Sequence, residues 1–393
     1  MNFAQDLVQR IRGVIGTEDA FVPLHIPEFS GREKELLINC LDTGWVSSAG
    51  EYVDRFEDDI ARLSGCKYGV AVVNGTSALE IALLVAGVEA NDEVLLPALT
   101  FVATANATSH AGAIPHFVDS AYNTLGICPQ RLRSHLEEIA EVRDGKTWNR
   151  FTGRCIAAVV PVHIFGCPVD IDEIDAVMSD WPMVVVEDAA ESLGSRYKGR
   201  PCGNLGKVAA VSFNGNKIIT TGGGGAIVTD DSRLAQRAKH LTTTAKIPHK
   251  WEFLHDDVGF NYRMPNINAA LGVAQLEQLD TRLYQKKNLL NAYSRAFDGF
   301  NGVTLFRAPA ISESNNWLVT LLLDQDYSHQ RDQLLQTLND AGIMVRPVWT
   351  LMHRLPMYTK NPRADLSCAE DLEARLINIP SSAYLGEKGI RNL

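Results

Sequence analysis

Seven short apolar runs, separated by polar or helix-like segments, limit the possible folds of this chain more than any other feature. Most runs are continuous rather than alternating and are rich in valine and isoleucine, as in strands buried on both faces of a sheet. The alternation with helix-like segments predicts an α/β fold with a large, mainly parallel mixed sheet. The last two runs are too close for a helical crossover, so we expect them to pair antiparallel. The runs cover residues 68–73, 93–97, 114–119, 156–163, 183–188, 208–213 and 226–229, and the helix-like segments cover 77–88, 129–142 and 171–179.

The pattern changes after about residue 232 and predicts a smaller C-terminal α+β domain. Two helix-like segments come first, the second long enough to connect two domains, and a strand, a helix and a strand follow. We predict a large α/β domain over residues 1–260, with the N-terminal segment, and a connecting helix with the small domain over 261–393. The expected elements are helices at 31–42, 233–243, 266–297 and 328–341, strands at 317–323 and 343–348, and an exposed loop at 143–154.

Composition excludes several classes of protein. The chain has 393 residues and a net charge of −10, and its arginines form no strong cluster, which argues against a nucleic-acid partner. Its seven cysteines are scattered without a CxxC pair, so reduced thiols are expected and a metal site is not. The start lacks a signal peptide, and no stretch reaches the roughly 18 apolar residues of a membrane span. We therefore expect a cytoplasmic protein without a membrane partner.

Lys217 is the only charged residue between Val208 and Thr229, in a stretch of apolar residues and glycines. Burial disfavours the ammonium form, so the amine of such a lysine can attack a carbonyl group. Ser212 adds a hydroxyl where the preceding strand ends. Together they suggest a lysine that holds a phosphorylated aldehyde, with pyridoxal phosphate as the candidate. The alternative is an exposed loop lysine.

Other polar residues follow the predicted strands directly. Because the carboxyl ends of parallel strands meet at one edge of the sheet, these side chains are expected to converge. Gly75, Thr76 and Ser77 open a helix and offer backbone N–H groups and hydroxyls to a phosphate, or they form a plain helix cap. The other residues at this edge are Thr100, Phe101, His163, Glu187 and Asp188.

Each of these residues has a chemical and a structural interpretation. Asp188 can keep a pyridine nitrogen protonated, so that the ring absorbs carbanion electrons, or it can cap a helix or form a salt bridge. Glu191 can reach the same ring or cap the turn. Phe101 can stack on a flat ring or lie in the core. His163 is either a wall of the site or a core histidine with its hydrogen bonds satisfied.

Several ordered motifs together resemble the fold-type I pyridoxal-phosphate sugar aminotransferases of the DegT/DnrJ type, over roughly residues 22–385. Within that family the resemblance is closest to the branch that aminates UDP-4-keto-6-deoxy-N-acetylhexosamines, as in legionaminic acid biosynthesis. The chain departs from many relatives at Gly222-Gly-Gly-Gly, where they have Gly-Glu-Gly-Gly. The motifs of the broader resemblance are Gly44-Trp-Val-Ser-Ser, Asn74-Gly-Thr-Ser-Ala-Leu, Pro97-Ala-Leu-Thr-Phe-Val-Ala-Thr-Ala-Asn, Glu187-Asp-Ala-Ala-Glu, Ser212-Phe-Asn-Gly-Asn-Lys and Gly259-Phe-Asn-Tyr-Arg-Met. Those of the narrower one are Pro23-Leu-His-Ile-Pro, Asp42-Thr-Gly-Trp and Arg346-Pro-Val-Trp-Thr-Leu-Met-His-Arg-Leu-Pro.

The resemblance implies a role for each residue of the edge. Lys217 would form the Schiff base with the cofactor, Asp188 would pair with the pyridine nitrogen, and Glu191 would lie near the ring hydroxyl. Family members are homodimers with shared active sites, so Asn261 would reach the phosphate from the neighbouring subunit. The resemblance also implies that Phe101 stacks on the ring and that the phosphate is bound by Gly75, Thr76, Ser77 and Ser212. Sugar-nucleotide contacts are implied for His163, Arg263 and His353. A surface ion pair explains Arg263 equally well, and a capped loop explains His353 equally well.

The predicted function is transfer of an amino group from L-glutamate to C4 of a UDP-4-keto-6-deoxy-N-acetylhexosamine. One alternative is a pyridoxal-phosphate-dependent sugar dehydratase on the same scaffold, but in those relatives histidine replaces the lysine. Another is a non-catalytic ligand sensor, which usually needs an attached DNA-binding domain, whereas only about 20 residues precede the matching region. A nicotinamide dehydrogenase is disfavoured because the chain lacks the dinucleotide glycine fingerprint.

Overall fold

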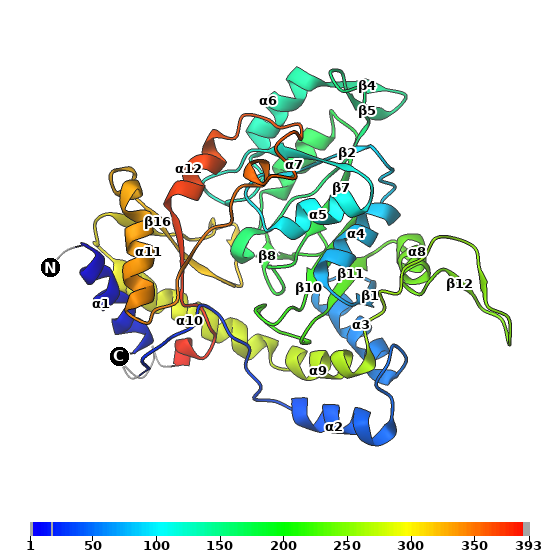
Figure 1. Cartoon of the computed structure of the whole chain (residues 1–393), viewed down its shortest axis with the longest axis horizontal. Coiled ribbons are helices and arrows are strands. Elements are labelled where there is room, and N and C mark those ends of the chain that lie inside the picture. The colour runs from blue at the N-terminus through cyan, green and yellow to red at the C-terminus, as the bar shows by residue number, and fades with distance from the viewer. Residues whose placement is uncertain (1–2, 17–18, 388–393) are drawn as a thin grey trace.

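The structure is a computed structural model that describes residues 3–16 and 19–387 (Figure 1). Its largest sheet has seven strands in the order β1-β11-β10-β7-β6-β2-β3. Strands β10, β7, β6, β2 and β3 pair in parallel, while β11 runs antiparallel to both β1 and β10. All seven coincide with predicted apolar runs, and the predicted α/β fold is confirmed. Their bounds are β1 Tyr68–Val72, β2 Glu93–Pro97, β3 Ile114–Val118, β6 Ile156–Val159, β7 Val184–Asp188, β10 Val208–Ser212 and β11 Gly225–Thr229.

Helices cover both faces of this sheet, which explains why its strands are apolar without alternation. Val208 and Ala210 of β10 pack in one cluster with α4 and α5, whereas Ala209 and Val211 pack in another with α3 and α9. A third cluster joins the sheet to α6 and α7. The helices of this part are α2 Glu33–Thr43, α3 Glu51–Leu63, α4 Gly75–Val85, α5 Val102–His110, α6 Pro129–Ile139, α7 Ile171–Met178, α8 Ser232–Thr242 and α9 Asn266–Leu276.

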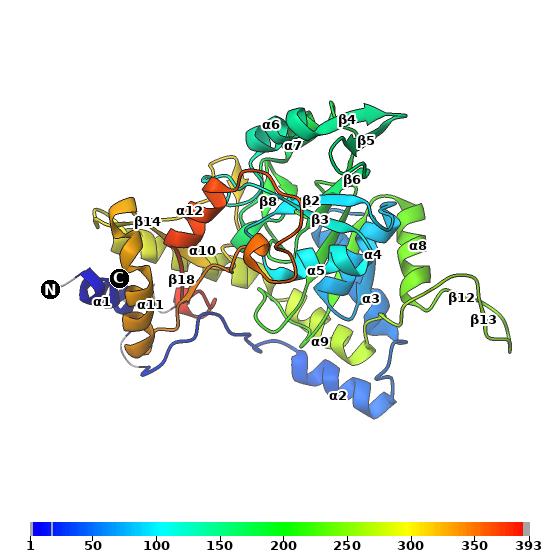
Figure 2. The same cartoon turned by 45° about the horizontal axis from the view of Figure 1, so that its top comes forward.

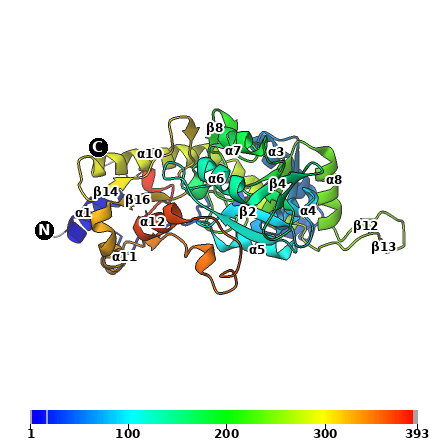
Figure 3. The same cartoon turned by 90° about the horizontal axis from the view of Figure 1, so that it is seen from above.

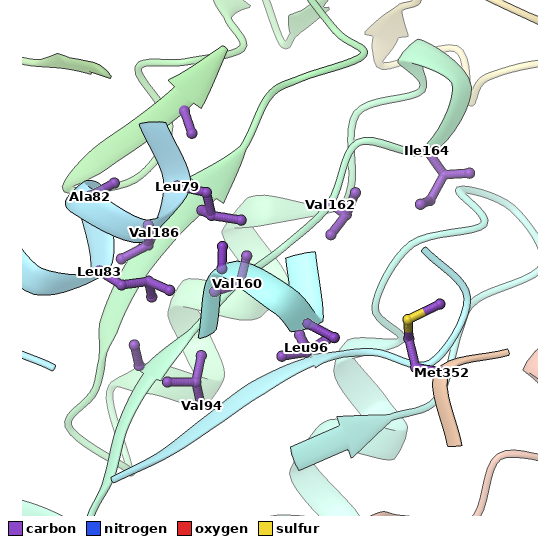
Figure 4. Packing of buried hydrophobic residues seen from close by; sticks show 14 of the residues in the cluster. Leu79, Ala82, Leu83, Val94, Leu96, Val160, Val162, Ile164, Val186 and Met352 are labelled. Carbon is purple, nitrogen blue, oxygen red and sulfur yellow. The ribbon is translucent and has the colours of Figure 1, made fainter. Parts of the chain in front are cut away.

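Figure 4 shows the cluster in which α4 packs on the sheet. Leu79 of α4 belongs to the same cluster as Val186 and Leu96 of the strands, and all three are buried. Met352, from the C-terminal part of the chain, belongs to the same cluster. The C-terminal part is therefore joined to the large sheet through the core and not only through its connecting helix.

The C-terminal part is built on a four-stranded antiparallel sheet in the order β14-β16-β18-β17. Leu7 and Ile11 of α1 are buried with Leu289 and Leu334 from this part, and α1 lies beside α11 (Figure 1). The N-terminal helix thus packs with the C-terminal core, and not with the large domain in which residues 1–260 were grouped, because its apolar face finds its partners there. The elements are α1 Phe3–Ile15, α10 Leu279–Phe297, α11 Arg331–Asp340, α12 Ser367–Arg375, β14 Val303–Leu305, β16 Val319–Leu323, β17 Arg346–Pro347 and β18 Leu376–Ile379.

Three local predictions differ from the structure. The single helix expected at 266–297 is two helices, α9 and α10. The strand expected at 343–348 contains only the two residues of β17. The polar loop expected at 143–154 contains strand β5 (Lys146–Asn149), which forms a hairpin with β4 (Ala140–Arg143) just before it. Its polar side chains have partners in the fold, since Thr147 donates to the carbonyl of Pro182 and Asn149 to the carboxylate of Glu93.

An arm formed by residues 246–258 projects from the body of the molecule (Figures 2 and 3). It carries strands β12 (Lys246–Ile247) and β13 (Leu254–His255), which pair antiparallel. Within the described residues no helix is both long and apolar enough to cross a bilayer. The remaining elements are β8 Arg196–Tyr197, β9 Arg200–Pro201, β15 Ser312–Glu313 and the short 3-10 helices Ile164–Gly166, Gln325–Gln330 and Met352–Arg354.

Replacing Leu96 with alanine tests the packing of the large sheet. Leu96 is fully buried, so the variant should lose about 2–5 kcal/mol of unfolding free energy through the cavity that it leaves. Denaturant unfolding followed by circular dichroism measures the change. The control is Val142→Ala on the exposed hairpin, expected within about 0.5 kcal/mol of the parent protein. Equal effects of the two substitutions would contradict the assignment of Leu96 to the core.

Candidate active site

A cavity of about 330 Å³ lies where strands β1, β7 and β10 end. Its position follows from the parallel sheet, because the polar residues after each strand meet at the carboxyl edge. The predicted site residues that line it are Gly75, Thr76, Phe101, Asp188, Glu191, Ser212 and Lys217.

Lys217 lies in the loop that joins β10 to β11, and the apolar residues after it fix its place. Ile218 and Ile219 are buried beside Phe213, and the backbone N–H of Lys217 donates to the carbonyl of Asn214 over 3.0 Å. The loop is thereby anchored in the core while the lysine side chain, 13% exposed, enters the cavity.

The amine of Lys217 has two neighbours from distant parts of the chain. Its Nζ lies 3.3 Å from Oε1 of Glu191 and 3.9 Å from the centre of the Trp317 ring. The other carboxylate oxygen of Glu191 accepts the backbone N–H of Phe165 over 2.8 Å. Burial raises the pKa of Glu191, and the charge of Lys217 opposes that rise. The carboxylate and the indole ring therefore hold the amine in a defined place.

Asp188 ends strand β7 with its carboxylate facing the cavity. It is 7% exposed. Oδ2 accepts the hydroxyl of Thr104 over 2.8 Å, and Oδ1 accepts the backbone N–H of Ala190 over 3.2 Å. Burial raises the pKa of Asp188, while these two hydrogen bonds and the charge of Lys217 oppose the rise.

The N-terminus of α4 also lines the cavity. Asn74 caps this helix by accepting the N–H of Ser77 on its side chain over 2.8 Å. The N–H groups of Gly75 and Thr76 donate to nothing in the part of the chain that the structure describes. A Cβ atom on Gly75 would lie 2.7 Å from Cβ of Ser212, so only glycine allows this close approach. Two free N–H groups, nearby hydroxyls and the positive helix end make a seat for a phosphate.

Aromatic rings form one side of the cavity. Phe101 is 51% exposed, and its ring centre lies 6.2 Å from that of Trp349. Phe165 contacts both Trp349, at 5.0 Å, and Trp317, at 6.3 Å. Flat rings of this kind suit a planar ligand.

Five of the residues that were given a role with the cofactor or substrate do not line this cavity, within the part of the chain that the structure describes. His163 is fully buried and satisfied, with Nε2 3.0 Å from Glu187 and Nδ1 accepting the N–H of Val169. This arrangement corresponds to the core interpretation of that histidine. Ser77 is buried behind the helix terminus. The other three are Asn261, Arg263 and His353.

Asn261, Arg263 and His353 lie further along the chain, in segments around the site. Asn261 is exposed, in the segment after the arm, and pairs with Thr243. Arg263 pairs through its backbone with Val72 at the end of β1, and Nε of its guanidinium is buried without a partner within the described ranges. Nε2 of His353 lies 3.2 Å from Glu370, and burial lowers the pKa of this histidine.

Residues 27–393 match the DegT/DnrJ/EryC1/StrS aminotransferase family. The chain belongs to this family. It is 35% identical over 370 residues to GDP-perosamine synthase of Escherichia coli O157:H7, covering 94% of this chain and 96% of that one. It is also 36% identical over 365 residues to GDP-perosamine synthase of Caulobacter vibrioides, covering 93% and 94%. The solved structure of DesI in the presence of its TDP-sugar product superposes with a TM-score of 0.83 at 27% identity, over 98% of this chain and 94% of that one.

As a member of the DegT/DnrJ/EryC1/StrS family, the chain is a pyridoxal-phosphate-dependent sugar aminotransferase. The residues of the cavity fit that cofactor. The α4 terminus with Thr76 and Ser212 suits the phosphate, the buried carboxylate of Asp188 suits a protonated pyridine nitrogen, and Lys217 supplies an amine in the same cavity.

Sequence reasoning missed several residues of this aminotransferase site. Thr104 and Trp349 line the cavity; both lie in motifs of the resemblance but were given no role in the site, and Trp317 was assigned only to a strand. Thr104 lies in the first turn of α5, just after the predicted edge residue Phe101. A helix prediction over 102–110 would have placed it beside the sheet edge, whereas the two tryptophans come from the C-terminal part and gave no such signal.

Gly75→Ala tests the close contact between α4 and β10. The added methyl group must push the helix terminus away from Ser212, so the affinity for pyridoxal phosphate should fall at least about tenfold, as for one lost charge-assisted hydrogen bond. Cofactor titration followed by absorbance measures this affinity. Gly215→Ala is the control, because a Cβ atom there meets nothing within 4 Å. Unchanged affinity in the Gly75 variant would remove the phosphate seat from this turn.

Proposed function

We propose that this enzyme transfers an amino group from L-glutamate to C4 of a UDP-4-keto-6-deoxy-N-acetylhexosamine. The supporting observation is that one cavity combines the amine of Lys217, the buried carboxylate of Asp188 and the N-terminus of α4. A nucleotide sugar is supported by the relatives, which include GDP-perosamine synthases and DesI with a TDP-sugar product. The uridine nucleotide and the N-acetylhexosamine rest on the narrower sequence motifs.

In this proposal each residue has a limited task. Pyridoxal phosphate, when bound, supplies an electron sink for the carbanion at the reacting carbon. Lys217 anchors the cofactor and moves the proton at that carbon, and Glu191 holds the lysine amine within 3.3 Å. Asp188 keeps the pyridine nitrogen protonated, since a buried carboxylate stabilises the proton between them.

The phosphate of the cofactor is assigned to Gly75, Thr76, Ser77 and Ser212 at the α4 terminus, and its ring to the exposed face of Phe101. Arg263 and His353 remain our candidates for the nucleotide sugar. Each has a nitrogen, Nε of Arg263 and Nδ1 of His353, that is buried without a partner in the described residues. Nε of Arg263 is a donor suited to the phosphates of a ligand, whereas Nδ1 of His353 is an acceptor suited to a ligand hydroxyl, because the Nε2–H of that ring donates to Glu370. His163 is retained only as support for the site, because Glu187 and Val169 already satisfy its ring.

Lys217→Ala should abolish transamination while leaving the fold intact. In the parent enzyme, L-glutamate should bleach the visible band of the bound cofactor and release 2-oxoglutarate. The variant should do neither, because it lacks the amine that moves the proton. Absorbance spectra and an assay of 2-oxoglutarate measure both effects, with Lys207→Ala, on an exposed lysine paired with Asp231, as the control. Substantial residual transamination by the Lys217 variant would refute its role.

The same assay distinguishes between the candidate sugar acceptors. The aminated enzyme should convert UDP-4-keto-6-deoxy-N-acetylhexosamine with a kcat/KM at least about tenfold higher than that for the GDP-4-keto-6-deoxy sugar. This difference is expected because the GDP sugar would lose at least one polar contact with the enzyme. Mass spectrometry of the product identifies the new amine. A preference for the GDP sugar would assign the acceptor class named for the E. coli and Caulobacter relatives instead.

We further propose a homodimer whose active sites are completed by the partner. The arm exposes the aromatic side chains of Trp251 at 74% and Phe253 at 81%, and exposed apolar side chains gathered on one segment mark an interaction site. Asn261 follows the arm directly, at a place from which it would reach the phosphate of the other subunit. The free thiols of all seven cysteines accord with a reducing compartment, and we place the enzyme in the cytoplasm.

Replacing both Trp251 and Phe253 with serine should shift the protein from dimer to monomer. Burial of two aromatic side chains contributes about 3–6 kcal/mol to such a contact. Analytical ultracentrifugation measures the shift, and Phe151→Ser on the hairpin is the control, because Phe151 is 71% exposed but lies away from the arm. A parent protein that sediments as a monomer would contradict the shared site.

A further inference from the structure

We infer that Thr104 is a positioning residue, which holds the carboxylate of Asp188 in the orientation that the cofactor ring requires. The inference rests on the role proposed for Asp188. It explains how the fold keeps the buried carboxylate of Asp188 ionised and holds it in one orientation.

The two oxygens of Asp188 have one internal donor each. Oδ2 accepts the hydroxyl of Thr104 over 2.8 Å, and Oδ1 accepts the N–H of Ala190 over 3.2 Å. The backbone of Asp188 is occupied as well, since its N–H donates to Pro161 and its carbonyl accepts the N–H of His163. Thr104 is therefore the one side-chain hydroxyl, among the described residues, that fixes the rotation of this carboxylate.

The direction of the hydrogen bonds follows from the chemistry of the groups. An ionised carboxylate can only accept, so the hydroxyl of Thr104 donates its proton to Asp188. The hydroxyl of Thr100, 2.9 Å from that of Thr104, must then donate to Thr104. A short relay from Thr100 through Thr104 to Asp188 results, and both threonines are buried at 1% exposure. Donation along a buried chain strengthens each bond.

The relay opposes the cost of burying the charge. Burial raises the pKa of Asp188, and the hydrogen bond from Thr104 is the largest of the effects that lower it again. The other groups that face this carboxylate are Lys217 and His163, which also lower its pKa, and Glu191, whose own pKa Asp188 raises. Removing the Thr104 hydroxyl should favour the protonated carboxyl group, which would bind a pyridinium less well.

The first turn of α5 supplies this hydroxyl because of where the helix begins. Phe101 precedes α5 with an extended backbone, so Thr104 falls in the first turn of the helix, where its hydroxyl reaches the carboxylate that ends β7. One turn later Thr108, also buried, uses its hydroxyl on the carbonyl of Thr104 and does not contact Asp188. The two threonines differ in what they bind and not in their burial, which provides a matched pair for the test.

The test compares Thr104→Val with Thr108→Val in the full-length enzyme. The valine at 104 keeps the branched shape and removes the donor. The dissociation constant for pyridoxal phosphate and kcat for L-glutamate should each worsen about tenfold, as for a lost hydrogen bond to a charged group, with KM within about twofold. Thr104→Ser restores the hydroxyl and should return both quantities to within about twofold of the parent. Thr108→Val should match the parent in cofactor affinity.

Two outcomes would overturn the inference. One is a Thr104→Val enzyme that binds the cofactor as tightly as Thr108→Val does. The other is a Thr104→Ser enzyme with the same loss of cofactor affinity and kcat as Thr104→Val, because the shape of the side chain and not its hydroxyl would then be responsible. If Thr104→Val does not fold by circular dichroism, Thr100→Val takes its place and should weaken cofactor binding in the same direction; parent-like binding would overturn the relay.

Asp188→Asn, titrated in parallel, separates this inference from the role on which it rests. If Asp188→Asn loses cofactor affinity and Thr104→Val keeps the affinity of the parent, only the positioning role of Thr104 is overturned. Parent-like affinity in Asp188→Asn overturns the role of Asp188 and the inference with it, while the Lys217→Ala assay still reports on transamination.

Discussion

The burial of the seven-stranded sheet on both faces is the constraint on which the rest of this structure depends. Val208 and Ala210 face one cluster of helices and Ala209 and Val211 the other, so the strands carry almost no polar side chain along their length. Polar groups can reach a ligand only where the strands end. The parallel arrangement brings those ends to one edge, and the cavity lies there.

At that edge the protein must stabilise carboxylates in a buried place. Glu187 lies behind the cavity and accepts N–H groups from Gly203, Leu205 and Gly206 besides the ring of His163. Burial raises the pKa of Glu187, but these hydrogen bonds outweigh burial and lower it. Neighbouring Asp188 has only two internal donors and remains open to the cavity. The carboxylate of Glu187 therefore serves the fold through its internal hydrogen bonds, whereas the carboxylate of Asp188 can still bind a ligand.

The C-terminal part completes the site, although it was expected only as a separate small domain. Trp317 places its ring over the amine of Lys217 and donates its indole N–H to the carbonyl of Asn216. Behind it, the buried amine of Lys286 donates to the carbonyl of Trp317 over 2.7 Å, and burial lowers the pKa of that lysine well below its usual range. Asn315 bonds the carbonyls of Glu191 and Leu193. These contacts join the two parts of the chain at the reacting lysine.

The sequence by itself determined the strands, their mainly parallel arrangement and the residues at their ends, because apolar continuity and the alternation of strands with helices are patterns along the chain. It therefore placed Lys217, Asp188 and the α4 terminus correctly at one edge. Only the tertiary structure decided which side chains touch them. Thr104, Trp317 and Trp349 meet the site through packing between distant segments, and α1 joins the C-terminal core for the same reason. A hydrogen bond or ring contact between residues far apart in the chain depends on the geometry of both elements, which no pattern along one of them contains.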